Sequence, residues 1–212
     1  MSSLLIIGAG GHSRPVISTA KSLGLWNILG ILDLGYKGQT ETILDVPVLG
    51  SINLLSRYKT CDTSLFIAVG DGRLRYELSI DVTLSSFKTV NIIHNSALID
   101  KSAKIGCGNF IGPFANIGPE VELGDFNIIN SYANIEHETT IGNFCEVSPG
   151  AIICGRCKVL DKVFIGSNAT IVEKKTLAQG TRIGAGATVV KSIIEKNQTQ
   201  VGVPAKPIMI GK

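Results

Sequence analysis

The segment Glu136-His137-Glu138 sets a histidine between two carboxylates in a region otherwise built from small and aliphatic residues. Imidazole ionises near neutral pH, so a histidine at the surface can take a proton from a substrate under physiological conditions. An exposed histidine without a role is the alternative. Three charged residues in a stretch that elsewhere prefers glycine favour chemistry, so we take His137 as the candidate proton acceptor.

A second candidate site is the glycine-rich turn Gly8-Ala9-Gly10-Gly11-His12-Ser13, which follows an apolar strand and precedes a stretch with helical apolar spacing. It matches the dinucleotide fingerprint only in part, because Ser13 takes the place of the third glycine. Free backbone N–H groups at a helix N-terminus attract phosphate. The turn therefore predicts phosphate binding, with a ligand-free tight connection as the alternative. The expected substrate-binding residues here are Gly10, Gly11, His12 and Ser13.

The elements around this turn indicate a small parallel α/β sheet. Residues 28–35 are expected to form an apolar strand that ends at Asp33, and residues 63–72 a strand that ends in a turn, alternating with helical stretches. Asp33 follows Gly8 at about the distance of a ribose-binding acid, and Gly70 and Arg75 follow the later strand. We expect all three at the same edge of the sheet, in a half-Rossmann domain over residues 1–90. This domain is too short for a nicotinamide cofactor.

The second half of the chain, residues 91–212, has a strict period. Every sixth residue from Ile93 to Val189 is aliphatic, the residue two positions earlier is usually small, and glycine often follows. A six-residue period predicts a parallel β-helix in which the aliphatic residues stack inside. Three units of six make a coil of about 18 residues, so the stretch forms about five coils. Glycine is expected where the backbone turns with positive φ. His137, two residues after inward-facing Ile135, is expected at a corner that faces outward.

The composition excludes several classes. Apolar residues make up 44% of the 212-residue chain and charged residues 17%, so a large core is available and disorder is not expected. The net charge of +3, without a dense basic cluster, argues against nucleic-acid binding. No apolar run reaches the ~20 residues of a membrane span, and the N-terminal stretch lacks the features of a signal peptide. We expect a cytoplasmic protein.

The cysteines and histidines do not predict a metal site. Cys154 and Cys157 have the spacing of half a zinc or redox site, but no second pair completes it, so small buried thiols are expected. A metal-dependent hydratase of the prism fold needs a cluster of histidine ligands, and the chain has only His12, His94 and His137.

An N-terminal GAGGHSR turn joined to a hexapeptide prism resembles the bacterial sugar acetyltransferases of the PglD and NeuD type. These acetylate UDP-4-amino-sugars or sialic acids. The resemblance covers essentially the whole chain and implies a left-handed prism, which the period alone does not fix. It also rests on the segments FIAVGDGRLR (66–75), NIIHNSALI (91–99), NSYANIEHETTIGNF (130–144), VSPGA (147–151), GAGATVVK (184–191) and VGVPAK (201–206).

By this resemblance His137 is the general base and Glu138 orients and polarises its ring. The backbone N–H of Gly155, one coil after His137, is implied to stabilise the oxyanion formed from the acetyl thioester. Four residues match positions that line the acetyl-CoA groove: Ser167, Ala185, Lys191 and Lys206. A solvated surface is the alternative for the two lysines.

The implied activity is acetyl-CoA-dependent acetylation of a nucleotide-linked amino sugar, UDP-linked in type, for surface glycan. The alternative is O-acetylation of a sialic acid or related nonulosonate. Where PglD-like enzymes often have a histidine that helps to hold the acceptor, this chain has Glu146, which leaves the acceptor open. A purely structural prism would not need the His-Glu cluster. The resemblance also implies a homotrimer with active sites between subunits.

Overall fold

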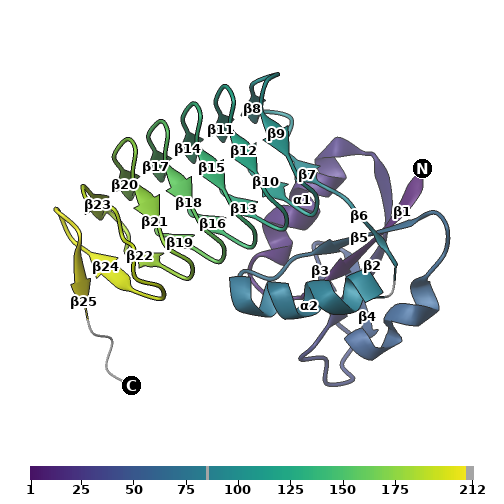
Figure 1. Ribbon diagram of the computed structural model, residues 1–212. Coiled ribbons are helices and arrows are strands. Elements are labelled where there is room, and N and C mark those ends of the chain that lie inside the picture. Colours follow the sequence, from purple (N-terminus) through teal and green to yellow (C-terminus); the bar gives the residue numbers. More distant parts are fainter. Residues whose placement is uncertain (85, 209–212) are drawn as a thin grey trace. The chain divides into compact units, whose positions relative to one another are not determined.

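The computed structural model describes residues 1–84 and 86–208 (Figure 1). The chain divides into two compact units, an α/β unit over residues 1–94 and a prism that begins at residue 95. The sequence had suggested a boundary at residues 90 and 91. The end of the predicted C-terminal tail, residues 209–212, lies outside the described residues.

The first unit is built on a six-stranded sheet with strand order β3-β4-β2-β1-β5-β6. Its strands pair in parallel, except for the antiparallel hairpin of β3 and β4. The elements up to residue 94 are β1 (Ser2–Ile7), α1 (Ser13–Leu23), β2 (Trp26–Asp33), β3 (Thr42–Ile43), β4 (Val46–Ser51), the 3-10 helix η1 (Ile52–Tyr58), β5 (Thr63–Ile67), α2 (Gly72–Leu84), β6 (Lys88–Thr89) and β7 (Ile92–Ile93).

The central strands explain why this unit folds as it does. β1 and β5 are nearly continuous aliphatic runs, and a parallel strand covered on both faces requires that pattern. The side chains of Leu4 and Ile7 in β1 and of Leu65 in β5 are fully buried. The strand expected within residues 63–72 ends at Ile67, and the residues that follow form the predicted turn, which leads into α2.

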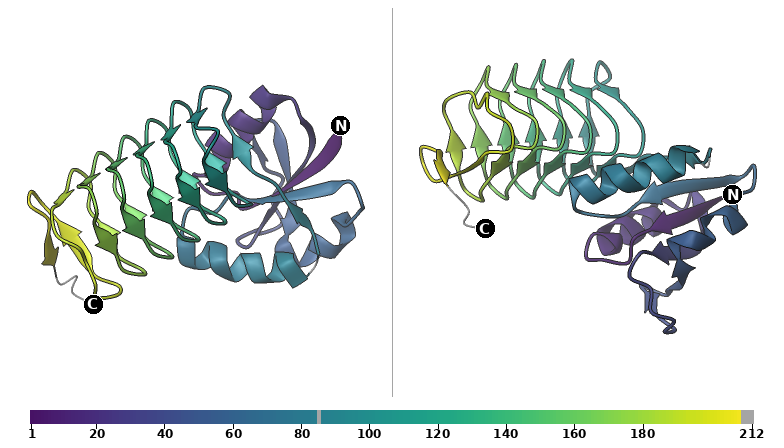
Figure 2. Two further views of the ribbon diagram at one scale, coloured as in Figure 1. Left: turned by 45° about the horizontal axis from the view of Figure 1, so that its top comes forward. Right: turned by 60° about the horizontal axis from the view of Figure 1, so that its bottom comes forward.

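The second unit is a left-handed parallel β-helix with three flat faces and strands of two residues, seen from two sides in Figure 2. Face 1 contains β10 (Phe110–Ile111), β13 (Ile128–Ile129), β16 (Glu146–Val147), β19 (Phe164–Ile165), β22 (Arg182–Ile183) and the longer β24 (Thr199–Val201) and β25 (Lys206–Ile208). Face 2 contains β8 (Leu98–Ile99), β11 (Asn116–Ile117), β14 (Asn134–Ile135), β17 (Ile152–Ile153), β20 (Thr170–Ile171) and β23 (Thr188–Val189). Face 3 contains β9 (Lys104–Ile105), β12 (Glu122–Leu123), β15 (Thr140–Ile141), β18 (Lys158–Val159) and β21 (Thr176–Leu177).

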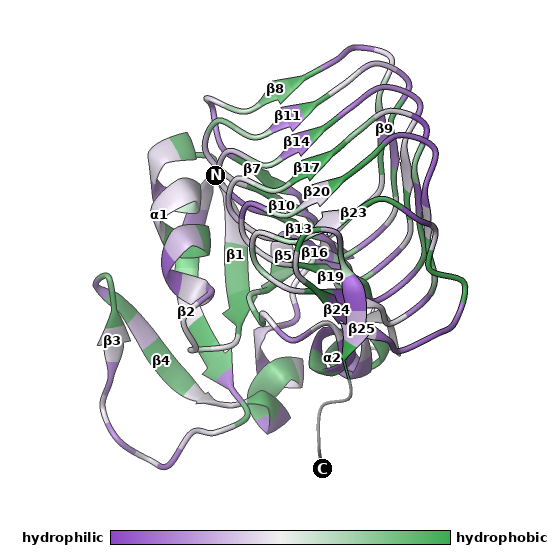
Figure 3. Ribbon diagram, turned by 90° about the vertical axis from the view of Figure 1, so that its left-hand side faces the viewer, coloured by the Kyte–Doolittle hydropathy of each residue, from purple (hydrophilic) through white to green (hydrophobic). Residues whose placement is uncertain are grey.

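The six-residue aliphatic pattern forms the core of the prism, as predicted. From Ile111 to Val189 each of these side chains is at most 3% exposed. Residues 18 apart stack on one another, as Asn116 does on Asn134 in face 2, and Figure 3 shows this face stacked in chain order from β8 to β23. Burying one isoleucine side chain contributes about 1.5–3 kcal/mol, so the column holds the coils in register.

The prediction that glycine marks turn positions with positive φ is correct for Gly108, Gly150, Gly180 and Gly186, but not for the glycines that directly follow the aliphatic residues. Gly142 and Gly166, which follow aliphatic residues, do not have positive φ. The left-handed position lies two residues further along each turn and is glycine in four turns but a large side chain in most others, such as Phe126 (φ 54°) and Lys162 (φ 58°). Glycine follows the aliphatic residue because the next coil passes close by. A Cβ at Gly166 would lie 2.6 Å from the backbone nitrogen of Ala185.

Candidate active site and nucleotide pocket

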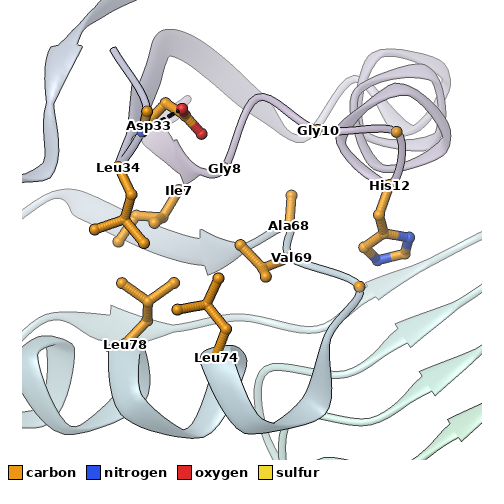
Figure 4. Close-up of a pocket in the computed structure, with 13 residues that line it drawn as sticks. Ile7, Gly8, Gly10, His12, Asp33, Leu34, Ala68, Val69, Leu74 and Leu78 are labelled. Carbon is orange, nitrogen blue, oxygen red and sulfur yellow. Dashed lines mark hydrogen bonds between the residues drawn. The ribbon is translucent and has the colours of Figure 1, made fainter. Parts of the chain in front are cut away.

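A pocket of about 400 Å³ opens in the first unit at the carboxyl ends of β1, β2 and β5 (Figure 4). Open parallel sheets bind their ligands at this edge. Five of the predicted substrate-binding residues line the pocket: Gly10, Gly11, His12, Asp33 and Gly70.

The glycines of the turn have two different roles. Gly8 has φ 104°, and a Cβ there would lie 2.7 Å from Cγ2 of Val69, so only glycine lets β1 end this close to the neighbouring loop. A Cβ on Gly10 or Gly11 would meet no atom within 4 Å. The absence of side chains at these two positions therefore leaves open space beside the first turn of α1, which suits a phosphate group.

Three predicted binding residues, Asp33, Ser13 and Arg75, form hydrogen bonds within the first unit. Asp33 accepts hydrogen bonds from the N–H groups of Ala9 and Gly35, both at 2.8 Å. Ser13 is buried, and its hydroxyl donates to the carbonyl of Gly10 at 2.7 Å.

Arg75 is only 1% exposed, and its Nη1 donates to the carbonyls of Val69 and Gly70 at 2.7 Å each. Neither Ser13 nor Arg75 lines the pocket. Both side chains hold the loops that form its rim.

His12 also lines the pocket. Burial, and secondly the charge of Arg75, lower the pKa of His12 to about 4. Its ring is therefore neutral at physiological pH, and a neutral imidazole can donate one hydrogen bond and accept another.

Several residues of this site were not identified from the sequence. Leu34, Leu74 and Leu78 give the pocket an aliphatic wall (Figure 4), of the kind that packs against a nucleobase or sugar. The two leucines of α2 have no sequence signal that separates them from core residues. Exposed Arg14, whose Nη1 donates to the carbonyl of Gly10 at 3.2 Å, is a further cation next to the glycine turn.

The charged cluster of the prism lies in the turn between β14 and β15, on the outside. His137 Nδ1 and Glu138 Oε2 are 2.9 Å apart, and the side chains are 49% and 40% exposed. The same carboxylate oxygen accepts a hydrogen bond of 2.9 Å from Nε of Arg156, in the next coil. Arg156 was not predicted. Adding one coil of 18 residues to Glu138 would have identified it.

Gly155 lies directly against the imidazole of His137. A Cβ at Gly155 would come within 2.6 Å of both Cε1 and Nε2 of the ring. The two coils are joined here by a backbone hydrogen bond of 2.9 Å from the N–H of Arg156 to the carbonyl of His137. A glycine is therefore needed at 155 for the ring to occupy this position.

The electrostatics of the pair fix the form of the histidine. The hydrogen bonds from His137 and then Arg156 hold the pKa of the Glu138 carboxyl below its ordinary value. An ionised carboxylate only accepts hydrogen bonds, so Nδ1 of His137 carries the proton and Nε2 keeps its lone pair. The arrangement can accept a proton at Nε2 and stabilise the resulting imidazolium through Glu138.

A second carboxylate stands beside this pair. Glu136 Oε1 accepts a hydrogen bond of 2.7 Å from the side-chain amide of Asn134, whose own oxygen accepts one of 2.7 Å from Asn116. Outward-facing residues of face 2 therefore hold Glu136 in place next to His137.

The remaining predicted residues lie apart from His137 in one chain. Lys191 follows β23, at the start of a turn on the same side of the prism as His137 and Gly155. Ser167 and Ala185 lie one above the other in the turns between face 1 and face 2. Glu146 lies on face 1, opposite the His137 turn, and Lys206 is in β25. A single chain does not bring Ser167, Ala185 or Glu146 to the His137–Glu138 pair.

The described residues contain neither a metal-ligand cluster nor a membrane-spanning helix. Within 1–84 and 86–208, no three side chains of histidine, cysteine, aspartate or glutamate gather as ligands for a metal ion. No helix in that part of the chain is long and apolar enough to cross a bilayer.

Comparisons with known proteins find matches to both units of the chain. Residues 3–82 match the PglD N-terminal domain, and residues 102–137 match the bacterial transferase hexapeptide family. PerB from Caulobacter crescentus, crystallised with CoA and GDP-perosamine, is 31% identical over 99% of this chain and 98% of its own, with a TM-score of 0.92. The acetyltransferase domain of PglB from Neisseria gonorrhoeae is 30% identical over 98% of this chain and 100% of its own, with a TM-score of 0.91.

A curated relative, an uncharacterized protein of Acanthamoeba polyphaga mimivirus, is 33% identical over 53% of this chain, and the match spans only 21% of that relative's length. The two bacterial structures, in contrast, match along nearly their whole length. The chain therefore belongs to the PglD-type family of hexapeptide-repeat sugar acetyltransferases.

Proposed function

We propose that this enzyme transfers the acetyl group of acetyl-CoA to the amino group of a nucleotide-linked amino sugar. The observation that carries the proposal is the half-exposed His137–Glu138 pair, with the imidazole of His137 lying against Gly155. It is supported by the two similar bacterial structures, of which PerB holds CoA and GDP-perosamine and the PglB domain has been crystallised with acetyl coenzyme A.

In this mechanism the thioester of acetyl-CoA supplies the activated acyl group. Nε2 of His137 accepts the proton that the sugar amine loses as its nitrogen bonds to the acyl carbon. Glu138 stabilises the imidazolium through Nδ1. The proton then leaves with the thiol of CoA, so the histidine returns to its neutral form. The backbone N–H of Gly155 is the proposed donor to the oxyanion.

The pocket of the first unit is the proposed nucleotide site. The open space at Gly10 and Gly11 fits a diphosphate, and the aliphatic wall that includes Leu34 and Leu74 fits a base or ribose. The sequence suggested a UDP-linked acceptor, whereas PerB binds GDP-perosamine. We therefore propose a nucleoside diphosphate amino sugar, with the base to be decided by experiment.

We further propose a cytoplasmic homotrimer with active sites between subunits. Supporting this, the His137–Glu138 pair lies on an exposed side of one chain, away from Ser167, Ala185 and Glu146. A neighbouring copy would supply these residues and the wall that excludes water. Light scattering, together with mixing of inactive His137→Ala subunits and inactive Lys206→Glu subunits, tests this. Recovered activity in mixed trimers is expected, and none would contradict it.

The function is tested by thiol release from acetyl-CoA with a panel of acceptors: UDP-linked amino sugars, GDP-linked amino sugars and free sialic acids. Release is expected with at least one nucleotide-linked amino sugar and not with the same sugar lacking its amine. Release only with free sialic acids would establish the O-acetyl transfer alternative. Release with none would refute the proposed function.

A further inference from the structure

One oxygen of Glu138 accepts two side-chain hydrogen bonds. Oε2 accepts hydrogen bonds of 2.9 Å from Nδ1 of His137 and of 2.9 Å from Nε of Arg156. The arginine is in the next coil, directly below the glutamate in the stack, and its side chain is 52% exposed. Two donors on one oxygen fix the carboxylate more firmly than one, and the hydrogen bond that links the Arg156 side chain to the His137 ring runs through Glu138.

The four residues form a closed set of contacts. His137 is held from the side by Glu138 and from below by Gly155, while the backbone N–H of Arg156 bonds to the carbonyl of His137 at 2.9 Å. The backbone N–H of Glu138 is itself bonded to the carbonyl of Pro119 at 2.9 Å, in the preceding coil. The backbones of Arg156 and Glu138 are therefore both fixed by hydrogen bonds. Because the two side chains are bonded to each other, Arg156 helps to hold the His137 ring in place through Glu138.

The charge of Arg156 opposes that of a protonated His137. A guanidinium always carries its charge, and here it shares the oxygen that stabilises the imidazolium. It therefore favours the neutral ring, and the acquired proton is passed on more easily. Besides His137, the titratable and charged groups of its turn and the two turns packed against it are Glu136, Glu138, Glu120, Cys154, Cys157 and Arg156. Arg156 is the one cation in that described set.

We propose that Arg156 is a positioning residue for acetyl transfer: it fixes Glu138, and through Glu138 it sets both the direction in which His137 presents Nε2 and the ease with which His137 releases its proton. This inference rests on the proposed function, and it adds a residue outside the expected active-site set. The guanidinium is suited to the role because its Nε and Nη groups lie in a rigid plane, whereas a lysine would supply charge without that geometry.

The first test is kinetic. Arg156→Gln is expected to lower kcat on the alkaline plateau roughly 10-fold, since small displacements of a catalytic group are costly. KM for acetyl-CoA and for the acceptor should stay within about twofold. The rising limb of the rate against pH should move upward by about half a pH unit, because a nearby positive charge is lost. Arg156→Lys should restore the position of the limb but only part of kcat.

The matched control is Lys174→Gln, because Lys174 is the next residue of the same stack, one coil beyond Arg156, and pairs with Glu173 at 3.7 Å. It removes the same charge without touching Glu138. If Lys174→Gln moved the rising limb of the rate against pH as far as Arg156→Gln does, loss of any nearby positive charge would explain the shift. The inference would then be wrong. A rise of tenfold or more in KM with an unmoved limb would instead make Arg156 a substrate-binding residue.

A second measurement does not depend on activity. The chain has three histidines, so NMR of ring-labelled protein, assigned with His137→Ala, follows the His137 ring directly. In Arg156→Gln its titration midpoint should rise and its Nδ1–H tautomer should become less populated. If the wild type transferred no acetyl group to any acceptor, the proposed function would fail while this titration still tested Arg156. An unchanged midpoint and tautomer would overturn the inference.

Discussion

The imidazole of His137 covers the Cα of Gly155, so that a Cβ at 155 would lie 2.6 Å from Cε1 and from Nε2. The two residues are one coil apart and belong to adjacent turns of the prism. The ring is thereby held against the backbone of Gly155 rather than against a side chain, and the His137 side chain stays 49% exposed. The proposed general base and the proposed oxyanion donor are therefore brought together by the pitch of the coil.

Gly155→Ala tests this contact. The added methyl group would push the ring outward, and we expect kcat to fall about 10²-fold, as for displacement of a catalytic group by about 1 Å. The side chain of His137 is 49% exposed and can move without disturbing the core, so the free energy of unfolding should change by less than about 1 kcal/mol. Kinetics and thermal unfolding of the purified variant measure both. An unchanged kcat would show that catalysis does not require the His137 ring to lie against Gly155.

The glycine position after the aliphatic residue and the left-handed position of the turn should differ in how strongly a substitution changes stability. In Gly142→Ala the Cβ would meet the backbone of the next coil, with Asp161 N at 3.0 Å and Leu160 C at 3.2 Å. This overpacking should cost about 1–3 kcal/mol. Lys162→Gly, at the left-handed position of the same corner, should change stability by no more than about 0.5 kcal/mol, because relief of φ 58° offsets the added freedom of the unfolded chain. Equal losses in urea unfolding would contradict this explanation of the glycines.

The sequence predicted the prism because its core has a strict period. An inward position every six residues must be aliphatic, and that requirement is visible without a structure. The turns were predicted only in part, because the left-handed position accepts Phe126, Glu138 and Lys162 as well as glycine and so carries a weak composition signal. The glycine that directly follows an aliphatic residue marks close approach of coils instead, which depends on the distance between residues about 18 apart.

Nucleotide binding by the first unit is tested by Gly11→Val. Gly11 does not have positive φ, and a Cβ there would meet nothing within 4 Å, so the fold should tolerate the change. The side chain would fill the space proposed for a phosphate. Calorimetry should show that UDP or GDP binding falls at least tenfold, while acetyl-CoA affinity and melting temperature remain as in the wild type. Retained nucleotide binding would place the phosphates elsewhere.

His12 predicts a pH dependence of stability. Its pKa is lowered by burial, and then by Arg75, from 6.5 to about 4. The unfolded chain therefore binds more protons than the folded one between these values, and stability falls as pH falls through this window, by up to about 3 kcal/mol.

Trp26, the single tryptophan, lies in β2 and reports unfolding of the first unit by fluorescence. His12→Asn should lose this part of the pH dependence. The same slope in both proteins would show that His12 becomes charged in the folded state.

The candidate active site was partly predictable for a related reason. His137 and Glu138 interrupt a regular repeat, so they were identified directly, and Gly155 lies one coil further on. Arg156 follows the same spacing, but an arginine at a turn looks like any solvated residue. The burial of Arg75 could not be predicted either, since it depends on carbonyl groups of Val69 and Gly70 in a loop.

The central claim is that His137 is the proton acceptor in acetyl transfer to an amino sugar. The most direct test is kcat for the wild type, His137→Ala and Glu138→Gln, measured against pH with the acceptor found in the panel. Because Ile135 and Ile141 keep the core intact on either side, His137→Ala should leave acetyl-CoA affinity and melting temperature nearly unchanged. Its kcat should fall roughly 10²–10⁴-fold, and the rising limb seen in the wild type should disappear. Glu138→Gln should lose less than His137→Ala. A His137→Ala enzyme that kept most of its activity and the same limb would contradict the assignment.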